Sequence, residues 1–422
     1  MRQNQYVLKI GAAVLAAAVV GCGGYKPPAG TAPVSGIKKR VLISNVASGS
    51  VNIMDAQKDV FSASVLTAPG ATKIVSSGGF TAVLDTAQSD ITVIDNTKET
   101  AIFRPVLTDQ PVDVAISTDG KTAWAAERSF GFVQQVDTAT GTAHPNILVP
   151  SVTRLVMGPN GKKLLAFSND PQANVLPNTD AFFVIDTASG TVTHITAQQP
   201  GSQPYTAVFD PSDTNDTTAF ILFCGTECGG TTSPGVSKVN FNAAAVFTPA
   251  VAPVAVFGAT VGLLSGGNLY VAGTPVPSVI VPGPACPLSR CGTLQIINTG
   301  SLTASTPPVR ITDGVHRKMA LTSTNRLYVG ASACTTDPGS AANTTRGCLT
   351  IFNTGSSSTK FPEESSFRQN FDVTGLQTIS GRNAIYICQG GELDIFDTST
   401  DAPTPNQLDV VGKAMDVVQI DP

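Results

Sequence analysis

Short apolar segments separated by turn residues recur along most of this chain. The clearest example is Phe182–Thr193, where an apolar strand leads into a turn from Asp186 to Gly190 and then into a strand of alternating β-formers. The first position of this turn, always Asp or Asn, recurs at intervals of 40 to 58 residues, at Asp55, Asp95, Asp137, Asp186, Asn240, Asn298, Asn353 and Asp397. A period of this length is typical of repeat proteins.

Each repeat is predicted to contain four antiparallel strands. The Asp or Asn side chain can accept a hydrogen bond from the backbone two residues on, and a later Gly supplies the positive φ that the turn needs. Upstream of each turn lies a partner strand, such as residues 122–126, preceded by another strand and a tight turn, such as residues 112–121. Four strands in each repeat of this length indicate a β-propeller blade.

The strand count predicts an all-β propeller of eight blades. Residues 40–66 supply three strands without a first one, and Asp416–Ile420 is a single strand with nothing after it. We predict that this last strand completes the first blade, because closure removes the exposed sheet edges. Seven blades is the alternative, if the fifth or sixth unit is not a true blade. The other first strands are expected at Thr72–Ser76, Asp113–Ser117, Arg154–Met157, Thr206–Phe209, Val261–Ser265, Lys318–Thr322 and Gln377–Ser380.

The N-terminus has the pattern of a targeting segment. Arg2 and Lys9 give a positive start, and the apolar residues 11–20 are too few to span a bilayer. The sequence that ends at Cys22 resembles the lipobox of bacterial lipoproteins, which implies a signal peptide at 1–21 and a lipid on Cys22; an ordinary secretory signal is the alternative. Gly23 replaces the Asp of the inner-membrane retention signal, so this resemblance implies the outer membrane of the cell envelope.

Three segments are therefore expected: the signal peptide, a lipidated tether rich in Pro and Gly at 22–39, and the propeller at 40–422. Low aromatic content (6%) and 39 Gly residues fit many short strands and tight turns. A net charge of −4 without basic runs argues against a nucleic-acid partner.

The repeat motifs at residues 114–127 and 133–141 resemble YVTN/lactonase-like and NHL-like propeller repeats of bacterial surface and periplasmic proteins. The resemblance covers residues 40–422 and is strongest in the second to fourth blades. It implies the fold more than any activity, because this architecture hosts many unrelated functions.

The connection between the second and third strands is long in four neighbouring blades, at Asn169–Asp180, Gly225–Ser237, Thr274–Gly292 and Ser332–Gly347. In a propeller these connections share a face with the blade-to-blade crossovers. Insertions on one face often mark a binding face, although neutral variation of surface loops is the alternative.

Six cysteines fall two per blade in or beside these connections, and we expect local disulfides among Cys224, Cys228, Cys286, Cys291, Cys334 and Cys348. Their spacing without nearby His is a poor zinc pattern. Cys388 lies in a predicted strand and is expected to be buried.

Polar residues at the start of the predicted first strands are candidates for a site at the mouth of the central channel: Asp113, Arg154, Thr206, Lys318 and Asp416. They could bind a small polar ligand or only hold water. No cofactor is predicted. The acidic stretch Asp210–Asp216 suggests calcium but lacks the Gly and distal Glu of a calcium loop. His316 is expected in a solvated crossover near the channel mouth.

These features favour a lipid-anchored binding or scaffold module of the cell envelope over an enzyme. Its partner would be an envelope protein, a polysaccharide or a small polar ligand, besides the membrane itself. The alternative is a lactonase-like or other hydrolytic enzyme acting at the channel mouth, and a purely structural surface protein is a third reading. No nucleophile elbow, zinc-protease motif or phosphate loop occurs in the sequence.

Overall fold

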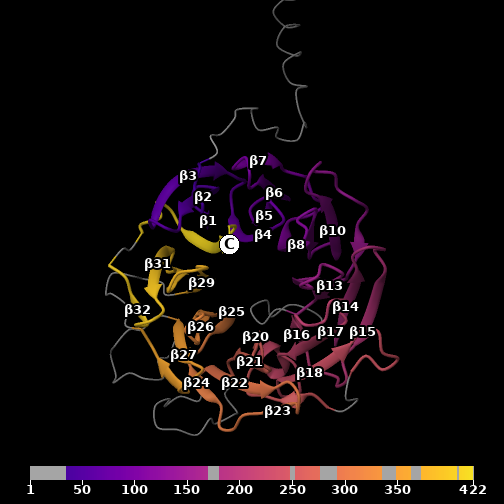
Figure 1. Ribbon diagram of the computed structural model, residues 1–422. Helices are drawn as coiled ribbons and strands as arrows, with labels where there is room; N and C mark the ends of the chain where they lie inside the picture. The colour runs from indigo at the N-terminus through magenta and orange to yellow at the C-terminus, as the bar shows by residue number, and fades with distance from the viewer. Residues whose placement is uncertain are drawn as a thin grey trace, which may run out of the picture.

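The computed structural model describes residues 35–169, 180–247, 252–275, 292–334, 348–362, 372–405 and 408–421. These residues form eight antiparallel sheets arranged as a ring (Figure 1). The protein is therefore an eight-bladed β-propeller, as predicted, and the seven-bladed alternative is wrong. We number the blades in chain order and call their strands first to fourth from the ring axis outward.

The first strands line the ring axis. They are β33 (Ala414–Gln419) in blade 1, then β4 (Ala71–Ser77), β8 (Pro111–Ile116), β12 (Arg154–Met157), β16 (Pro204–Phe209), β20 (Val261–Ser265), β25 (Val315–Leu321) and β29 (Val373–Thr378). The last of these, in blade 8, begins four residues before the predicted Gln377–Ser380 segment. The other boundaries agree with prediction to within a few residues.

The second strands are β1 (Arg40–Asn45), β5 (Phe80–Asp85), β9 (Thr122–Glu127), β13 (Lys163–Phe167), β17 (Thr218–Phe223), β21 (Asn268–Gly273), β26 (Arg326–Ser332) and β30 (Ala384–Gln389). The third strands are β2 (Ser50–Asp55), β6 (Asp90–Asp95), β10 (Phe132–Asp137), β14 (Ala181–Asp186), β18 (Gly235–Asn240), β22 (Gly292–Asn298), β27 (Leu349–Asn353) and β31 (Glu392–Asp397).

The fourth strands form the outer rim. They are β3 (Val60–Leu66), β7 (Thr100–Phe103), β11 (Ile147–Leu148), β15 (Val192–Thr196), β19 (Val254–Ala255), β23 (Thr303–Ala304), β28 (Ser358–Lys360) and β32 (Ala402–Pro403). A further strand, β24 (Val309–Ile311), also pairs with β22 in blade 6. A short 3₁₀ helix, η1 (Gly225–Cys228), follows β17.

The C-terminal strand closes the ring. β33 pairs with β1, with Val418 opposite Leu42 and Val417 opposite Ile43. Blade 1 therefore joins the two ends of the described chain, as predicted, and the edge that β1 would otherwise expose is covered. In Figure 1 the yellow C-terminal segment lies beside the indigo strands of blade 1.

In the described part of the chain the core consists of eight apolar clusters, one between each pair of neighbouring blades. The cluster between blades 3 and 4, for example, contains Trp124 of blade 3 and Leu164 of blade 4. Because a second strand is covered by neighbouring blades on both faces, it is almost continuously apolar: every residue of β30 is buried. The rim strand β3, by contrast, is mostly exposed. The sequence gradient from apolar inner strands to polar rim follows from this arrangement.

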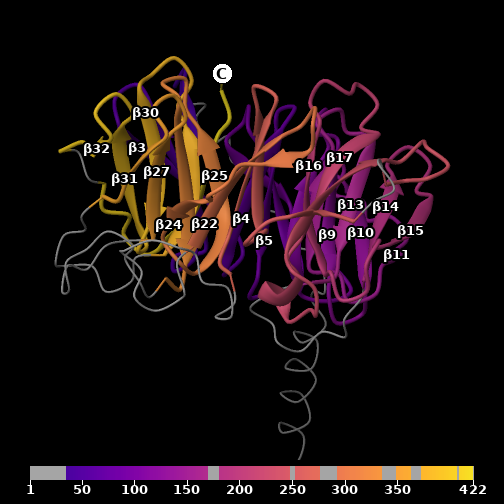
Figure 2. The same ribbon diagram turned by 90° about the horizontal axis from the view of Figure 1, so that it is seen from below.

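The two faces of the ring differ in what they carry. One face, here the turn face, holds the turns between first and second strands, the turns between third and fourth strands, and the C-terminus. The other, here the connection face, holds the connections between second and third strands, including η1, and the crossovers between blades. Figure 2 shows the C-terminus at the upper edge and the coiled ribbon of η1 at the lower edge.

Candidate functional site

The predicted channel-mouth residues occupy equivalent positions on the first strands. In six blades the first strand has one residue, near its start, that is left out of the pairing with the second strand. The residue directly after it occupies the same position in each of these blades. In blade 2 the hydroxyl of the left-out residue, Thr72, donates to a carbonyl of the second strand. Thr153 in blade 4 and Thr260 in blade 6 donate to the corresponding carbonyl of their own second strands, so the residues after them are the equivalent ones. These eight residues, which we call the belt, are from blade 1 to blade 8 Asp416, Lys73, Asp113, Arg154, Thr206, Val261, Lys318 and Gly375.

Both belt carboxylates hold neighbouring blades together. Asp113 accepts a hydrogen bond from Lys73 Nζ at 2.5 Å, and its Oδ2 accepts the backbone N–H of Leu155 in blade 4 at 2.7 Å. Asp416 repeats this arrangement two blades earlier, in blade 1, because its Oδ2 accepts the N–H of Ile74 in blade 2 at 3.1 Å. Carboxylates with these partners link the first strands around the axis.

Asp416 also receives a cation across a whole blade. Lys318 of blade 7 places its Nζ 2.6 Å from Asp416 Oδ1 in blade 1. The blade between them carries Gly375 at the belt position, where a Cβ would lie 3.0 Å from backbone atoms of Asp416 and Val417. The missing side chain leaves room for the lysine to reach past blade 8. Both oxygens of Asp113 and of Asp416 are thus already bonded.

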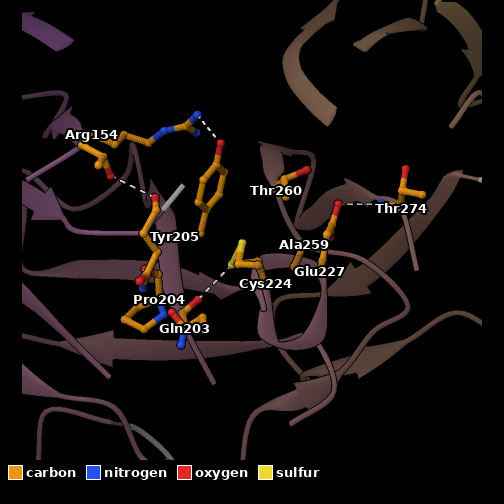
Figure 3. The surroundings of a disulfide bond; sticks show 12 residues. Arg154, Gln203, Pro204, Tyr205, Cys224, Glu227, Ala259, Thr260 and Thr274 are labelled. Carbon is orange, nitrogen blue, oxygen red and sulfur yellow. Dashed lines mark hydrogen bonds between the residues drawn. A yellow bond between two sulfur atoms is a disulfide. The ribbon is translucent and has the colours of Figure 1, made fainter. Parts of the chain in front are cut away.

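Arg154 is held by an aromatic residue. Its Nη2 donates to the hydroxyl of Tyr205 at 2.6 Å, and its guanidinium carbon lies 4.1 Å from the centre of the Tyr205 ring. Figure 3 shows the two side chains meeting at their tips. Tyr205 is the residue skipped in the blade 5 pairing, and it is buried with 1% exposure. A buried tyrosine therefore fixes the direction of the arginine.

A disulfide-closed turn lies beside this pair in blade 5. Cys224 is bonded to Cys228 around η1, and the Cys224 N–H donates to the carbonyl of Gln203, two residues before Tyr205. Within the same turn, Glu227 accepts the N–H of Thr274 at 2.7 Å and that of Ala259 at 3.0 Å, both in blade 6 (Figure 3). The turn therefore links the part of blade 5 that carries Tyr205 to blade 6.

Two of the expected disulfides are present in the described residues, Cys224–Cys228 and Cys334–Cys348. Cys286 and Cys291 lie outside those residues, as do Cys22 and the signal peptide. Cys388 is unpaired and buried in β30, as predicted. Most of the connections of blades 4, 6 and 7 lie outside the described residues, so the predicted raised rim is not described.

His316 differs from the prediction of a solvated crossover. It lies on β25 with no exposed surface, because its ring packs against the backbone of Gly292 and its Nε2 lies 2.9 Å from the carbonyl oxygen of Thr312. Burial lowers the pKa of His316 to about 4, so the imidazole is neutral at pH 7. A neutral buried ring does not attract an anion.

The acidic stretch at 210–216 serves its own loop and a neighbouring blade. Asp213 accepts backbone N–H groups of Asn215, Thr217 and Thr218. Asp216 accepts the N–H groups of Asn160 and Lys162 in blade 4. Over the described ranges no group of three His, Cys, Asp or Glu side chains is placed to hold a metal ion. In the same ranges no helix has the length and apolar character to cross a bilayer.

Five of the eight belt residues were predicted from the sequence as channel-mouth residues. The other three, Lys73, Val261 and Gly375, were not. Lys73 is the second residue of the predicted first strand Thr72–Ser76, so its position in the repeat was visible in the sequence. The role of Tyr205 has no such signal, because only its contact with a residue 51 positions earlier reveals it.

The fold and the belt define the class of this protein as an eight-bladed β-propeller with a charged inner ring. No family model matches the chain, and no curated protein matches it in sequence. Several solved structures share the fold.

The dihydro-heme d1 dehydrogenase NirN in complex with DHE is 10% identical with a TM-score of 0.65, over 93% of this chain and 77% of that one. AztD of Citrobacter koseri is 13% identical with a TM-score of 0.58, over 90% and 97% of the two chains. Hydrazine synthase of Kuenenia stuttgartiensis is 16% identical with a TM-score of 0.50, over 90% and 100%. At these identities the likeness concerns the fold alone.

Proposed function

We propose that this protein is a lipid-anchored propeller of the bacterial cell envelope that serves as a binding or scaffold module rather than as an enzyme. In this proposal residues 1–21 are removed as a signal peptide, Cys22 carries the lipid, residues 22–39 form the tether and residues 40–422 form the ring. The partner face is the part of the connection face that belongs to blades 4 to 7. The partner is an envelope protein, a polysaccharide or a small polar ligand.

The observation that carries this proposal is the uneven spacing of second and third strands. In blades 1, 2, 3 and 8 the third strand begins three to five residues after the second strand ends. In blades 4 to 7 the gap is far longer: β13 ends at Phe167 and β14 begins at Ala181, and β21 ends at Gly273 and β22 begins at Gly292. Disulfides close these connections in blades 5 and 7. Cross-linked insertions confined to one arc of one face are typical of a binding face.

The state of the charged side chains supports a scaffold over a hydrolase. The belt carboxylates Asp113 and Asp416, which a lactonase-like mechanism would need free, each bind a lysine and a backbone N–H of a neighbouring blade. Such carboxylates stabilise the ring. Stability of the framework is what a platform for long loops requires.

The entry point of the chain supports the orientation. Ser35 donates its N–H to Glu99 at 2.9 Å, in the turn between third and fourth strands of blade 2. The described chain therefore starts on the turn face, opposite the long connections. An anchor at Cys22, only 13 residues earlier in the sequence, would favour a ring whose turn face lies toward the membrane and whose connection face lies toward partners.

The test uses two kinds of variant in cells with intact envelopes. Cys22→Ala should move the protein from the membrane fraction to the soluble envelope fraction. Replacing the connections of blades 5 to 7 by short turns, with their cysteines removed in pairs, should abolish partner capture from envelope extracts. The matched control replaces the tight turn Thr86–Ser89 of blade 2. If the loop-shortened protein folds and retains every partner, the proposed face is wrong.

A further inference from the structure

The belt contains one cation more than it has carboxylates. Lys73 pairs with Asp113, and Lys318 pairs with Asp416. Arg154 is the third belt cation, and across the described residues no carboxylate lies within ion-pair distance of it. An arginine at the axis of a ring, beside two satisfied ion pairs, carries an uncompensated positive charge.

The guanidinium of Arg154 is only partly used. Among the described residues its one hydrogen-bond acceptor is the Tyr205 hydroxyl, which takes a proton of Nη2. A guanidinium has five N–H donors in a planar fork, and this geometry matches the paired oxygens of a carboxylate or phosphate. The remaining N–H groups of Arg154 have no hydrogen-bond acceptor among the described residues, so they can donate to a ligand.

The support beneath Arg154 is rigid. The Tyr205 side chain is buried, and the carbonyl of the preceding Pro204 accepts a hydrogen bond from the amide of Asn169 in blade 4 at 2.7 Å. The disulfide turn fixes Gln203 through the Cys224 N–H at 3.0 Å. Donors that are fixed before a ligand arrives bind it at a smaller entropic cost.

The next two belt positions after Arg154 carry no charge. They are Thr206 in blade 5 and Val261 in blade 6, and Lys318 beyond them is directed to Asp416. No belt carboxylate therefore lies on this side of Arg154 to repel an anion. This uncharged sector belongs to blades 5 and 6, two of the four blades with long connections.

We propose that Arg154, positioned by Tyr205, binds an anionic oxygen group, a carboxylate or a phosphate, of a ligand that reaches the inner wall between blades 4 and 5. This inference rests on the proposed function, because it states that the ligand bound from the connection face is an anion. The site selects a ligand with a compact anionic end, and it contributes binding and no reaction step.

Equilibrium dialysis at low ionic strength tests the site, with labelled inorganic phosphate in one arm and labelled acetate in the other. We expect the wild-type protein to bind about one equivalent of at least one of these ions. Arg154→Gln should weaken that binding about tenfold or more, since charge-assisted hydrogen bonds are lost. The matched control is Lys58→Gln, which removes a cation that is 74% exposed on the turn face and should leave binding unchanged.

Two further variants keep the test decisive. Arg154→Lys retains the charge but loses the planar fork, so it should bind more weakly than wild type and better than the Gln variant. If Arg154→Gln fails to fold, Arg154→Lys takes its place in the test. Tyr205→Phe keeps the ring but removes the hydroxyl that directs the guanidinium, and we expect a smaller loss. The arm that shows binding distinguishes a phosphate from a carboxylate ligand.

The inference is overturned if neither ion binds at millimolar concentration, or if Arg154→Gln binds as tightly as Lys58→Gln. Its failure is distinguishable from failure of the proposed function. Partner capture that depends on the blade 5 to 7 connections but persists in Arg154→Gln would retain the connection face and remove only the anion site.

Discussion

The ring is held together differently in the arc where its ends meet and in the neighbouring arc of blades 3 and 4. Blades 8, 1 and 2, here the closure arc, carry Asp401, Asp59 and Glu99 at the fifth position of the turn between third and fourth strands. Each of these acids pairs with an arginine of the preceding blade: Arg326, Arg382 and Arg40. In blades 3 and 4 the same position is glycine, Gly141 and Gly190.

The fifth turn residue of each of these five blades has a positive φ, between 56° and 70°. Glycine adopts this conformation without a steric penalty, whereas Asp and Glu adopt it less readily. The acids in the closure arc therefore occupy a position where glycine would fit more easily. Their side chains compensate by forming a second kind of contact between blades.

In blades 3 and 4 the turn is bonded to its own blade instead. The hydroxyls of Thr138 and Thr187, each next to the turn aspartate, donate to the carbonyls of Gly120 and Gly161, both at 2.6 Å. Blade 1 has Ala56 at that position. At this turn, therefore, blades 3 and 4 use a hydrogen bond within the blade, whereas the three blades around the ring closure use an ion pair to the preceding blade.

Removal of the closing strand should break this comparison most severely. Truncation after Lys413 exposes the edge of β1 and deletes Val417, which is part of the core between blades 8 and 1. We expect loss of cooperative unfolding and rapid proteolysis of blade 1, measured by thermal circular dichroism and limited proteolysis. Val417→Ala should give a milder effect, because it keeps the strand. A truncated protein that melts like the full chain would contradict the role of closure.

Arg382→Gln should show what one closure ion pair contributes. Arg382 donates from Nη1 at 2.6 Å and Nη2 at 2.9 Å to the two oxygens of Asp59, which the Tyr386 hydroxyl also contacts. Loss of the arginine leaves a mostly buried carboxylate short of partners, so we expect unfolding in denaturant to require about 3 kcal/mol less. Lys58→Gln removes an exposed cation near Asp55 and should cost under about 0.5 kcal/mol.

The acid limb of the stability curve gives a second readout of the same pair. Burial raises the pKa of Asp59, but the hydrogen bonds from Arg382 and Tyr386 outweigh it, so its pKa lies below the ordinary value. The folded state therefore releases this proton more readily than the unfolded chain does. The contribution of Asp59 is present above about pH 4 and is lost as the pH falls below it. In Arg382→Gln the free energy of unfolding should fall less steeply below pH 4. An unchanged pH dependence would contradict the role of Arg382 in lowering the pKa of Asp59.

Cys224→Ala with Cys228→Ala tests how the arc opposite the closure is braced. The disulfide closes a loop with a sequence separation of 4, for which the chain-entropy model gives about 2 kcal/mol. Because the same turn holds Glu227 on blade 6, the amide protons of Ala259 and Thr274 should exchange faster in the variant. Equal exchange rates in both proteins would show that Glu227 keeps its place without the disulfide.

The sequence predicted the parts of this structure that repeat. The turn aspartates and asparagines, the eight blades and the closing strand each follow from a spacing that is visible along the chain. The same holds for the local disulfides, whose partners are near in sequence. Belt positions such as Asp113 and Asp416 were also accessible, because they lie at a fixed place in the repeat.

Contacts that depend on one blade's neighbour were not predictable in this way. Arg382 and Asp59 are separated by 323 residues, and neither breaks the local pattern of its turn. The burial of His316 depends on Gly292 and Thr312, which a repeat pattern does not bring together. Such contacts follow from the register between adjacent sheets, which period and composition leave open.

Thr138→Val should measure the contribution of the hydrogen bond from Thr138 to Gly120 within blade 3, at the turn where the closure arc has ion pairs between blades. Thr138 is fully buried, and valine keeps its shape while leaving the carbonyl of Gly120 without a donor, so we expect a loss of about 1 kcal/mol in the free energy of unfolding. The matched control is Thr354→Val in blade 7, whose hydroxyl lies at 3.3 Å from the carbonyl of Asn325 in an exposed turn. It should cost much less, because water can replace that bond. Equal losses in the two variants would mean that the threonine acts through its β-branched shape, and the contrast between the two arcs would then rest on the ion pairs alone.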